Sequence, residues 1–421
     1  MAKTARPVPA RICHVITTPQ DQFASGLRTR LQAQICQDLG FEVDVVTGWG
    51  LNDPGLVSPP LAGVVYHRLP YLTKYVSPRQ DFQALIGLYR LFRKRRYQVV
   101  QTHLAKAGVL GRIAAGLARV PVVVHDVPGY GYPPTHARPL RRLYLALDRW
   151  AGHFTTHYIF YAKHLLETFE AMRIGPRASK TVIHTGVDFS SFLTAPKLSP
   201  RERDQKRAVW GLSPQELVIG YVARMVPSKG HDLAIRALRL LLDRRPQAKL
   251  FLIGGAIWPE EKKFFGELQA LVQESGVSGK VIFAGHQSQV VQYYQMFDVY
   301  VSPSLFEGSP LNVTEAVLME LPVVAFNIPA ISEFFSATAI ITPLGDIAGL
   351  SRGLEQAITQ VMAGHKQSSP AFRKKLVETF SPARWRKNLT DFYQDLILGN
   401  HFPEFVGSWE LSHEKEILRL I

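Results

Sequence analysis

Short apolar runs alternate with helical patterns along the chain, and this alternation occurs twice. The runs expected to be strands in the first half are Ile12–Thr17, Glu42–Thr47, Val64–Arg68, Val99–His103, Pro121–His125 and Tyr158–Tyr161. Helical patterns such as Ser25–Leu39 and Gly108–Leu117 lie between them. The runs of the second half are Leu217–Ala223, Lys249–Ile253, Val281–Phe283, Val299–Pro303, Pro322–Phe326 and Ala339–Ile341. This order predicts an α/β protein with two doubly wound domains, each built on a parallel sheet covered on both faces.

A polar stretch separates the two halves. Residues Thr194–Lys206 break the alternation and are expected to be a linker. At 421 residues the chain is too long for one ordinary core. We therefore expect an N-terminal domain over residues 1–195 and a C-terminal domain over 207–381, followed by a helix at 382–398. One face of that helix is apolar, and we expect it to pack back on the first domain. No role is assigned to the tail at 399–421.

Composition is that of a soluble globular protein, with 46% apolar and 20% charged residues. The sequence contains no run of about eighteen apolar residues, so no transmembrane helix is expected. The basic N-terminus lacks a hydrophobic region before the first strand, so no signal peptide is expected either. Cys13 and Cys36 fall in a strand pattern and a helix pattern, which favours buried thiols over a disulfide. These observations predict a cytoplasmic protein.

The net charge of +15 is concentrated in the first half of the chain. Residues 1–190 have a balance of +13, whereas residues 191–421 have +2. Basic residues are densest in Leu85–Gln98, where leucines and a phenylalanine alternate with Arg90 and the cluster Arg93–Arg96. Such a helix is able to lie on an anionic membrane surface, which would place the protein peripherally at the inner face of the plasma membrane. The alternative is an ordinary domain helix with a solvated basic face. No nucleic-acid motif accompanies the charge.

The second half carries two glutamates in a setting suited to binding hydroxyls. Glu307 follows a strand pattern and Glu315 lies where a helix pattern begins, with a glycine turn between them. A strand, a glycine turn and a helix N-terminus form a corner whose free N–H groups attract anions. A carboxylate there is expected to accept hydrogen bonds from the hydroxyls of a ribose or a sugar rather than to bind phosphate.

Two cations follow the strand pattern Leu217–Ala223. Arg224 and Lys229 lie in the turn before Gly230, at the carboxyl end of that strand. Ligands of open α/β sheets bind at this edge. Arginine offers a planar fork and lysine a point charge for phosphate oxygens. Two cations for a diphosphate and two carboxylates for hydroxyls predict a nucleotide-sugar site.

Taken together these motifs resemble a known family. The chain is similar, over roughly residues 10–398, to the retaining GT-B glycosyltransferases of family 4, also called glycosyl transferases group 1. The residues that carry the resemblance are Gly220, Arg224, Lys229, Gly230, Glu307, Glu315 and the segments His184–Asp188 and Thr102–His125. The last segment is similar to bacterial capsule and surface-polysaccharide members. The resemblance implies two Rossmann-like domains that face each other across a cleft.

The resemblance also implies an activity. It implies transfer of a hexose from a UDP- or GDP-linked donor to a lipid-linked or polysaccharide acceptor in cell-surface glycan synthesis. The nucleotide sugar is a substrate, so no cofactor is expected. The chain has no Asp-x-Asp motif, which favours a metal-independent reaction. Two alternatives remain open: a nucleotide-sugar epimerase of the same architecture and a non-catalytic nucleotide-sugar-binding protein.

Roles follow residue by residue from the resemblance. Arg224 and Lys229 are expected to stabilise the leaving diphosphate, and Glu307 to lie beside the transferred sugar. The expected donor-binding residues are Gly26, Gly308, Leu311, Asn312 and Glu315. Among these, Glu315 holds the ribose, and Gly26 lies in the loop after the first strand. Possible contacts of the acceptor or sugar are His103, Lys106 and His125. A lone histidine at a strand end is alternatively structural.

Several positions depart from the family pattern. Pro128 occupies the place of a histidine that many relatives carry before Gly129. Pro329 and Ala330 replace a pair of glycines, although Glu333 is retained. Glu320 stands where relatives have glycine. These departures are the reason that the non-catalytic alternative is kept.

Overall fold

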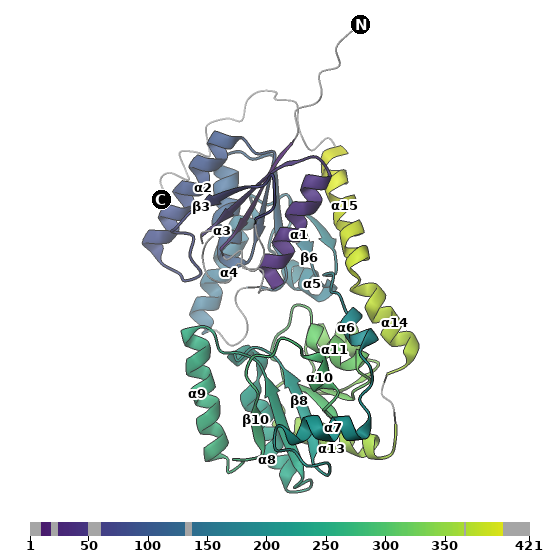
Figure 1. Cartoon of the computed structure of the whole chain (residues 1–421). Coiled ribbons are helices and arrows are strands. Elements are labelled where there is room, and N and C mark those ends of the chain that lie inside the picture. Colours follow the sequence, from purple (N-terminus) through teal and green to yellow (C-terminus); the bar gives the residue numbers. More distant parts are fainter. Residues whose placement is uncertain (1–9, 18–23, 49–59, 131–136, 366–367, 399–421) are drawn as a thin grey trace. The chain divides into compact units, whose positions relative to one another are not determined.

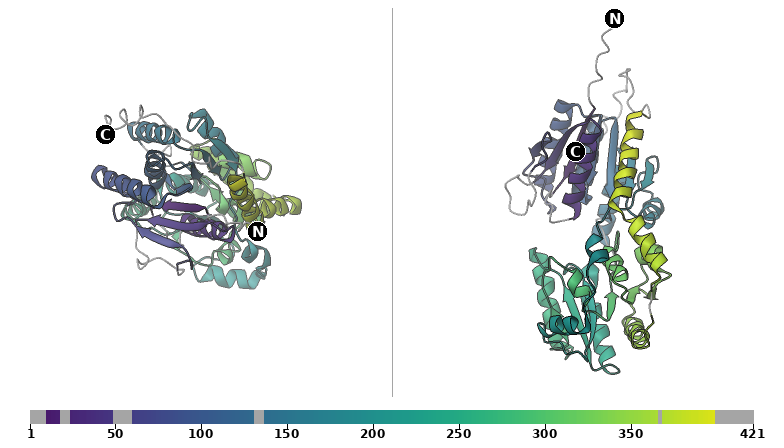
Figure 2. Two further views of the ribbon diagram at one scale, coloured as in Figure 1. Left: turned by 90° about the horizontal axis from the view of Figure 1, so that it is seen from above. Right: turned by 45° about the vertical axis from the view of Figure 1, so that its right-hand side comes forward.

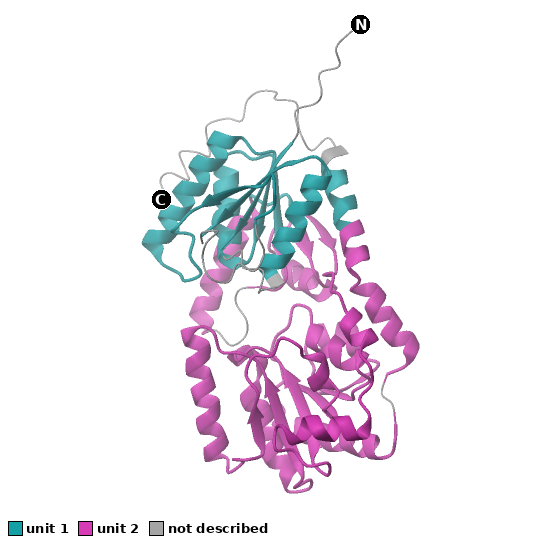
Figure 3. Ribbon diagram, in the orientation of Figure 1, with its two compact units in different colours: residues 1–125, 154–157, 388–421 teal, residues 126–153, 158–387 magenta. Residues whose placement is uncertain are grey.

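The chain forms two compact units (Figure 3). The computed structural model describes residues 10–17, 24–48, 60–130, 137–365 and 368–398. Unit 1 comprises residues 1–125, 154–157 and 388–421, and unit 2 comprises residues 126–153 and 158–387. Residues 18–23 and the tail at 399–421 lie outside the described residues, as does the start of the chain. The domain limits expected from the sequence stay a prediction.

A parallel sheet of seven strands occupies the first half of the chain. Its strand order is β3-β2-β1-β4-β5-β6-β7. The strands are β1 (Arg11–Ile16), β2 (Glu42–Thr47), β3 (Val65–Arg68), β4 (Val99–His103), β5 (Val122–Val127), β6 (His157–Phe160) and β7 (Ser179–Val182). In the register of the central strand β1, Ile12 is paired with Val43 of β2 and Val99 of β4. All six expected strands are confirmed, and β7 is an additional one.

The helices of this half are α1 (Ala24–Asp38), α2 (Pro78–Arg95), α3 (Ala105–Leu117), α4 (Arg138–Gly152) and α5 (Lys163–Ala171). The last helix of the described chain, α15 (Pro382–Leu398), ends in unit 1. There Tyr393 is buried, and its hydroxyl donates to Oε1 of Gln101 at 2.7 Å. Its ring also meets Phe41 edge-on. Within unit 1, the apolar face of α15 therefore packs on the elements around β4 and α1.

Helix α2 contains the basic segment expected at a membrane. Its apolar residues Ala84, Leu88 and Phe92 are buried in the core of unit 1. Arg95 of its last turn donates two hydrogen bonds of 3.1 Å to the buried carboxylate of Asp44. Burial alone would raise the pKa of Asp44, but hydrogen bonds from His67 and Tyr97 and the charge of Arg95 lower it. The apolar stripe of α2 thus serves the core, which fits the ordinary-helix alternative.

A second parallel sheet of six strands lies wholly in unit 2. Its order is β10-β9-β8-β11-β12-β13. The strands are β8 (Leu217–Val222), β9 (Ala248–Ile253), β10 (Val281–Phe283), β11 (Val299–Ser302), β12 (Val323–Phe326) and β13 (Ala339–Thr342). Ile219 of β8 is in register with Leu250 of β9 and Val299 of β11. Each of these strands matches an expected run to within one residue at either end, so the doubly wound α/β prediction is confirmed.

Helices flank both faces of this second sheet (Figures 1 and 2). They are α6 (Ser190–Thr194), α7 (Pro200–Ala208), α8 (His231–Leu242), α9 (Pro259–Glu274), α10 (Val291–Tyr294), α11 (Leu311–Leu318), α12 (Pro329–Phe335), α13 (Ile347–Met362) and α14 (Pro370–Thr379). None of the helices in the described part of the chain combines the length and apolarity needed to cross a bilayer. Cys13 and Cys36 are both buried thiols, as expected.

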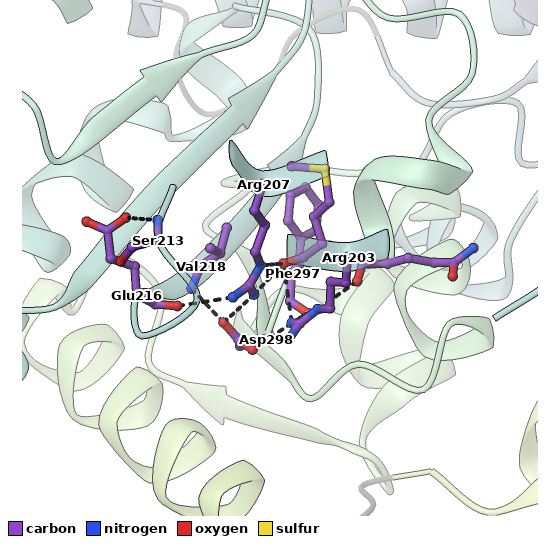
Figure 4. A network of polar contacts seen from close by, with 9 residues as sticks. Arg203, Arg207, Ser213, Glu216, Val218, Phe297 and Asp298 are labelled. Carbon is purple, nitrogen blue, oxygen red and sulfur yellow. Dashed lines mark hydrogen bonds and ion pairs between the residues drawn. The ribbon is translucent and has the colours of Figure 1, made fainter. Parts of the chain in front are cut away.

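The expectation of a linker at Thr194–Lys206 is wrong for its second part, which is helical. Helix α7 begins at a capping box, in which the Ser199 side chain accepts from the backbone N–H of Glu202 and the Glu202 carboxylate accepts in return. Two arginines of α7 then bind Asp298 before β11: Arg203 at 2.7 Å and the buried Arg207 at 2.8 Å (Figure 4). The polar composition of this stretch reflects charge pairing with the second sheet.

Candidate active site

The turn after β8 carries the two cations expected at a diphosphate. Lys229 ends a short 3-10 helix, Pro227–Lys229, and Gly230 follows with a φ of +65°. A Cβ atom on Gly230 would lie 2.1 Å from the carbonyl oxygen of Pro303. Both the left-handed backbone and the close approach require glycine at this position. Gly230 thereby sets the direction in which the turn presents Lys229.

Lys229 is directly paired with Glu307. Its Nζ lies 2.6 Å from Oε1 of Glu307, whose side chain is 7% exposed, against 20% for Lys229. The buried hydroxyl of Ser304 donates to the same carboxylate oxygen at 2.8 Å. The hydroxyl of Tyr221 donates to the carbonyl oxygen of Lys229 at 2.8 Å. The structure therefore joins one expected phosphate ligand to the carboxylate expected beside the sugar.

Arg224 is held differently, because most of its side chain is exposed. The exposed fraction is 60%, and Nη1 donates to Oε1 of Glu261 at 3.2 Å. Glu261 is buried at the N-terminus of α9, where its other oxygen accepts from the N–H groups of Ile257 and Trp258 at 2.8 and 3.2 Å. The N–H groups at the start of α9 thus orient the Glu261 carboxylate, and this carboxylate in turn orients Arg224. The open guanidinium retains access to an anion.

Glu315 lies in α11, beside a buried tyrosine. The hydroxyl of Tyr294 donates to Oε2 of Glu315 at 2.7 Å and lies 3.1 Å from the carbonyl oxygen of Asn312. Burial raises the pKa of Glu315 to about 7, and the hydrogen bond from Tyr294 only partly opposes this. The amide of Asn312 donates to the carbonyl oxygen of Val222, at the end of β8, at 2.9 Å. The N–H of Leu311 donates to the carbonyl oxygen of Ser309 at 2.9 Å.

Gly308 is required by a close contact within unit 2. A Cβ atom on Gly308 would lie 1.8 Å from the carbonyl oxygen of Pro128, which follows β5. Next to this contact, the rings of Phe306 and Tyr130 lie with centroids 4.5 Å apart. Pro128, the residue that departs from the family pattern, therefore contacts the Glu307 loop through its backbone carbonyl group.

A histidine and a glutamate fix the same loop from α5. The Glu333 carboxylate accepts from the N–H groups of Lys163 and His164 at 2.9 and 2.8 Å, and Nδ1 of His164 lies 2.8 Å from it. Nε2 of His164 lies 3.3 Å from the carbonyl oxygen of Glu307. Burial would raise the pKa of Glu333, but these hydrogen bonds lower it. His164 therefore joins α12 to the backbone of Glu307.

The remaining expected residues belong to unit 1, where each has structural contacts. Oγ1 of Thr102 lies 2.8 Å from Nδ1 of His125, and a Cβ atom on Gly108 would lie 2.4 Å from the His125 ring. Nε2 of His103 lies 3.1 Å from Nδ1 of His14. These contacts of His125 and His103 fit the structural alternative, and an acceptor role for either stays a prediction.

Lys106 and Gly26 complete this group. Lys106 forms an ion pair with Asp81 and donates to the carbonyl oxygen of Tyr75, so it braces the segment before α2. Gly26 is buried in the first turn of α1 rather than in the expected loop, because the helix begins two residues earlier, at Ala24. A diphosphate contact of Gly26 stays a prediction.

Sequence reasoning missed several residues that position the site. Ser304 and Glu261 carried local signals: Ser304 stands three residues before Glu307, and Glu261 is the third residue of a helix that begins with proline. Tyr221, Tyr294 and His164 carried no such signal. Their contacts depend on strands and helices that meet only in the folded chain.

Two doubly wound α/β halves are the architecture of a GT-B glycosyltransferase, and the second half carries the Lys229–Glu307 pair and the buried Glu315. Residues 202–371 match the family model for glycosyl transferases group 1, and residues 24–186 match the model for the glycosyl transferase 4-like domain. Residues 202–371 thus belong to the glycosyl transferases group 1 family, and residues 24–186 to the glycosyl transferase 4-like domains.

Curated relatives agree with this assignment. The UDP-Gal:alpha-D-GlcNAc-diphosphoundecaprenol alpha-1,3-galactosyltransferase of Escherichia coli is 28% identical over 341 residues, which cover 78% of this chain and 84% of that protein. The capsular polysaccharide biosynthesis glycosyltransferase CapM of Staphylococcus aureus is 24% identical, over 70% of this chain and 76% of that protein.

Solved structures show the same fold. The sucrose-phosphate synthase of Thermosynechococcus elongatus has a TM-score of 0.74 at 19% identity, covering 93% of this chain and 100% of that one. The HepE protein of Anabaena in complex with UDP and glucose has a TM-score of 0.70 at 19% identity, covering 92% and 100%. The chain is a glycosyltransferase, and its similarity is to proteins of bacterial surface-polysaccharide synthesis.

Proposed function

We propose that this glycosyltransferase moves a hexose from a UDP-sugar to a sugar carried on a polyprenyl diphosphate, with retention of the anomeric configuration. The observation that carries the proposal is the contact of Lys229 with Glu307, which unites a phosphate ligand and a sugar ligand. The Escherichia coli relative supports both substrates, because its name gives UDP-Gal as donor and a diphosphoundecaprenol-linked acceptor. The HepE complex supports UDP in this fold.

The leaving group decides what the two cations do. Breaking the bond between sugar and UDP leaves an additional negative charge on the diphosphate. Lys229 and Arg224 lie on one turn, and their charges stabilise that developing negative charge more strongly than the bound donor. The ammonium of Lys229 has three hydrogens, so it is able to bind a phosphate oxygen while it keeps its contact with Glu307.

The carboxylates act on the neutral part of the donor. Glu315, in the second turn of α11, accepts hydrogen bonds from the ribose hydroxyls, and Glu307 accepts from the transferred sugar. Gly308 lets the backbone approach the sugar, with the N–H groups of Leu311 and Asn312 nearby. Retention places the incoming hydroxyl on the face that the diphosphate leaves, where the diphosphate itself takes up the proton. No side chain is assigned as the base.

Location and domain organisation follow from the acceptor. A polyprenyl diphosphate resides in a membrane, so the enzyme works at the inner surface of the plasma membrane as a peripheral protein. The basic N-terminal domain, residues 1–195, would carry the membrane contact, and residues 207–381 the donor site. Transfer would proceed without a metal ion, because Arg224 and Lys229 supply the positive charge. Addition of EDTA should leave the rate unchanged.

Release of nucleoside diphosphate tests the proposal. The protein is incubated with UDP-, GDP- and ADP-linked hexoses, with and without a bacterial lipid extract. Release of UDP that requires both one donor and the lipid supports the proposal. Conversion of the donor sugar without lipid and without release identifies the epimerase. Binding of UDP with no turnover under any condition identifies the non-catalytic nucleotide-sugar-binding protein. The relatives carry the names of transferases, which favours the first result.

A further inference from the structure

Helix α4 exposes large apolar side chains together with arginines. Leu143 is 54% exposed, and Leu140 and Trp150 are each 39% exposed. Arg138, Arg142 and Arg149 of the same helix are also exposed. Its one acidic residue, Asp148, is buried, as are Ala151 and Gly152. The outward side of α4 is therefore apolar and positive, with no exposed acid.

The exposed residues are arranged in two adjoining rows. At 100° per residue, Pro139, Leu143, Ala146 and Trp150 fall on one face of the helix, because they are three or four positions apart. Arg138, Arg142 and Arg149 form a row along one edge of that face. Nε of Arg149 donates to the carbonyl oxygen of Met172 at 2.8 Å, which holds this arginine at the edge. The apolar row and the basic row run the length of the helix.

Helix α2 is also basic, but its exposed surface differs from that of α4. Its buried stripe, Ala84, Leu88 and Phe92, is used by the core of unit 1, so the exposed residues of its last two turns are charged. An interfacial helix needs an apolar face that enters the headgroup boundary and cations that meet anionic lipid. Helix α2 exposes one large apolar side chain, Phe82 at 48%, together with Arg79 near its start. Helix α4 instead presents an apolar row and a basic row along its length.

We infer that α4 is an interfacial helix that lies on an anionic lipid bilayer, with Leu143 and Trp150 in the headgroup boundary and the arginine row on lipid phosphates. The inference rests on the proposed function, because an acceptor on a polyprenyl diphosphate is reached at such a surface. Charge complementarity selects the lipid class: three exposed arginines without an exposed acid on the helix fit an anionic lipid, for which phosphatidylglycerol is the probe. Tryptophan is typical of this boundary, since its ring is apolar and its N–H is polar.

Vesicle co-sedimentation tests the inference. The full chain is mixed with vesicles of phosphatidylcholine, alone or together with phosphatidylglycerol. The wild type should sediment only with the anionic vesicles. Arg138→Ala/Arg142→Ala should lower the partition coefficient by about tenfold or more, since each basic residue near the surface adds about fivefold. Leu143→Ser should lower it severalfold through lost apolar insertion.

The matched control removes the same charge from the other helix. Arg93→Ala/Lys94→Ala deletes two exposed cations of α2, and it should change the partition coefficient much less than the α4 double variant. Equal losses from α2 and α4, or no preference of the wild type for anionic vesicles, would overturn the inference. Thermal unfolding checks that each variant is folded.

A second readout separates this inference from the proposed function. Transfer to a water-soluble acceptor with a short lipid should be the same for the wild type and the α4 variants. Absence of transfer by a wild type that still sediments through α4 would refute the proposed function and leave the membrane surface standing. Normal transfer by a wild type that does not bind vesicles would refute the membrane surface on α4 and leave the proposed function standing.

Discussion

The ammonium nitrogen of Lys229 lies 2.6 Å from a carboxylate oxygen of Glu307, and the two residues come from different turns at the edge of the second sheet. Lys229 precedes α8 and Glu307 precedes α11. The side chain of Glu307 is 7% exposed, so its negative charge has little access to water. The pair therefore links the stability of unit 2 to the geometry of the proposed donor site.

Removing one member of this pair should cost more stability than removing both. Lys229→Met leaves a buried carboxylate without its cation, a change that typically costs roughly 3 kcal/mol. Lys229→Met/Glu307→Gln removes both charges and should recover part of that loss. Urea unfolding of the wild type, both single variants and the double variant measures the coupling. Additive losses would show that the pair contributes nothing to unit 2.

Donor binding should depend on pH through Glu315. Its pKa is about 7 in the protein because it is buried. In the proposed function, ribose hydroxyls donate to its ionised form. Binding should therefore lower this pKa, so affinity rises as the pH increases toward about 7 and then levels off. Calorimetry with UDP-galactose, whose diphosphate does not titrate in this range, should detect proton release below pH 7. If the Glu315→Gln variant still released a proton on binding UDP-galactose, the proton would come from another group.

His164 should act through the backbone of Glu307 and not through the donor nucleotide. His164→Asn removes the contact to the Glu307 carbonyl oxygen and weakens the link to Glu333. We expect kcat to fall about tenfold or more, as for a misplaced catalytic group, while the Kd for UDP stays unchanged. Lys163→Ala is the control, because Lys163 is the neighbour of His164 in the sequence and its side chain is 73% exposed. A parallel loss of UDP binding would indicate a general disturbance of the fold.

Glu320 has the left-handed backbone that glycine prefers, with a φ of +63°. Its carboxylate lies 3.1 Å from Arg373, so replacing it also removes an ion pair. Glu320→Gly and Glu320→Ala both lose that pair, but only the first relieves the backbone. The glycine variant should be more stable than the alanine variant by about 1 kcal/mol. Equal urea midpoints would contradict this.

The strands could be predicted because their apolar runs stand out from polar turns. The expected bounds of β2, β4 and β10 are those of the structure. Strand β7 was missed, since Val182 is its one apolar residue and no position in it is fully buried. Helix α7 was missed for the opposite reason: its stability comes from a capping box and from the binding of Arg203 and Arg207 to Asp298, and composition shows neither.

The sequence could place the candidate site residues on the second sheet, but it could not predict their contacts. The positions of Arg224, Lys229 and Glu307 follow from charged residues after strand patterns, and that of Glu315 from a helix pattern. The direct contact of Lys229 with Glu307 depends on the neighbouring positions of β8 and β11 in the sheet. The link from Glu333 through His164 to Glu307 joins three segments far apart in the sequence, and no local pattern marks it.

Transfer of labelled sugar by the wild type and by Lys229→Ala tests the central claim most directly. The donor is the UDP-hexose that supports UDP release, and the acceptor is the lipid fraction that release requires. The account predicts a labelled, lipid-linked product from the wild type and a rate lower by at least about a hundredfold from a folded Lys229→Ala, because the leaving diphosphate loses its cation. Equal rates from the two proteins would contradict the assignment of this site.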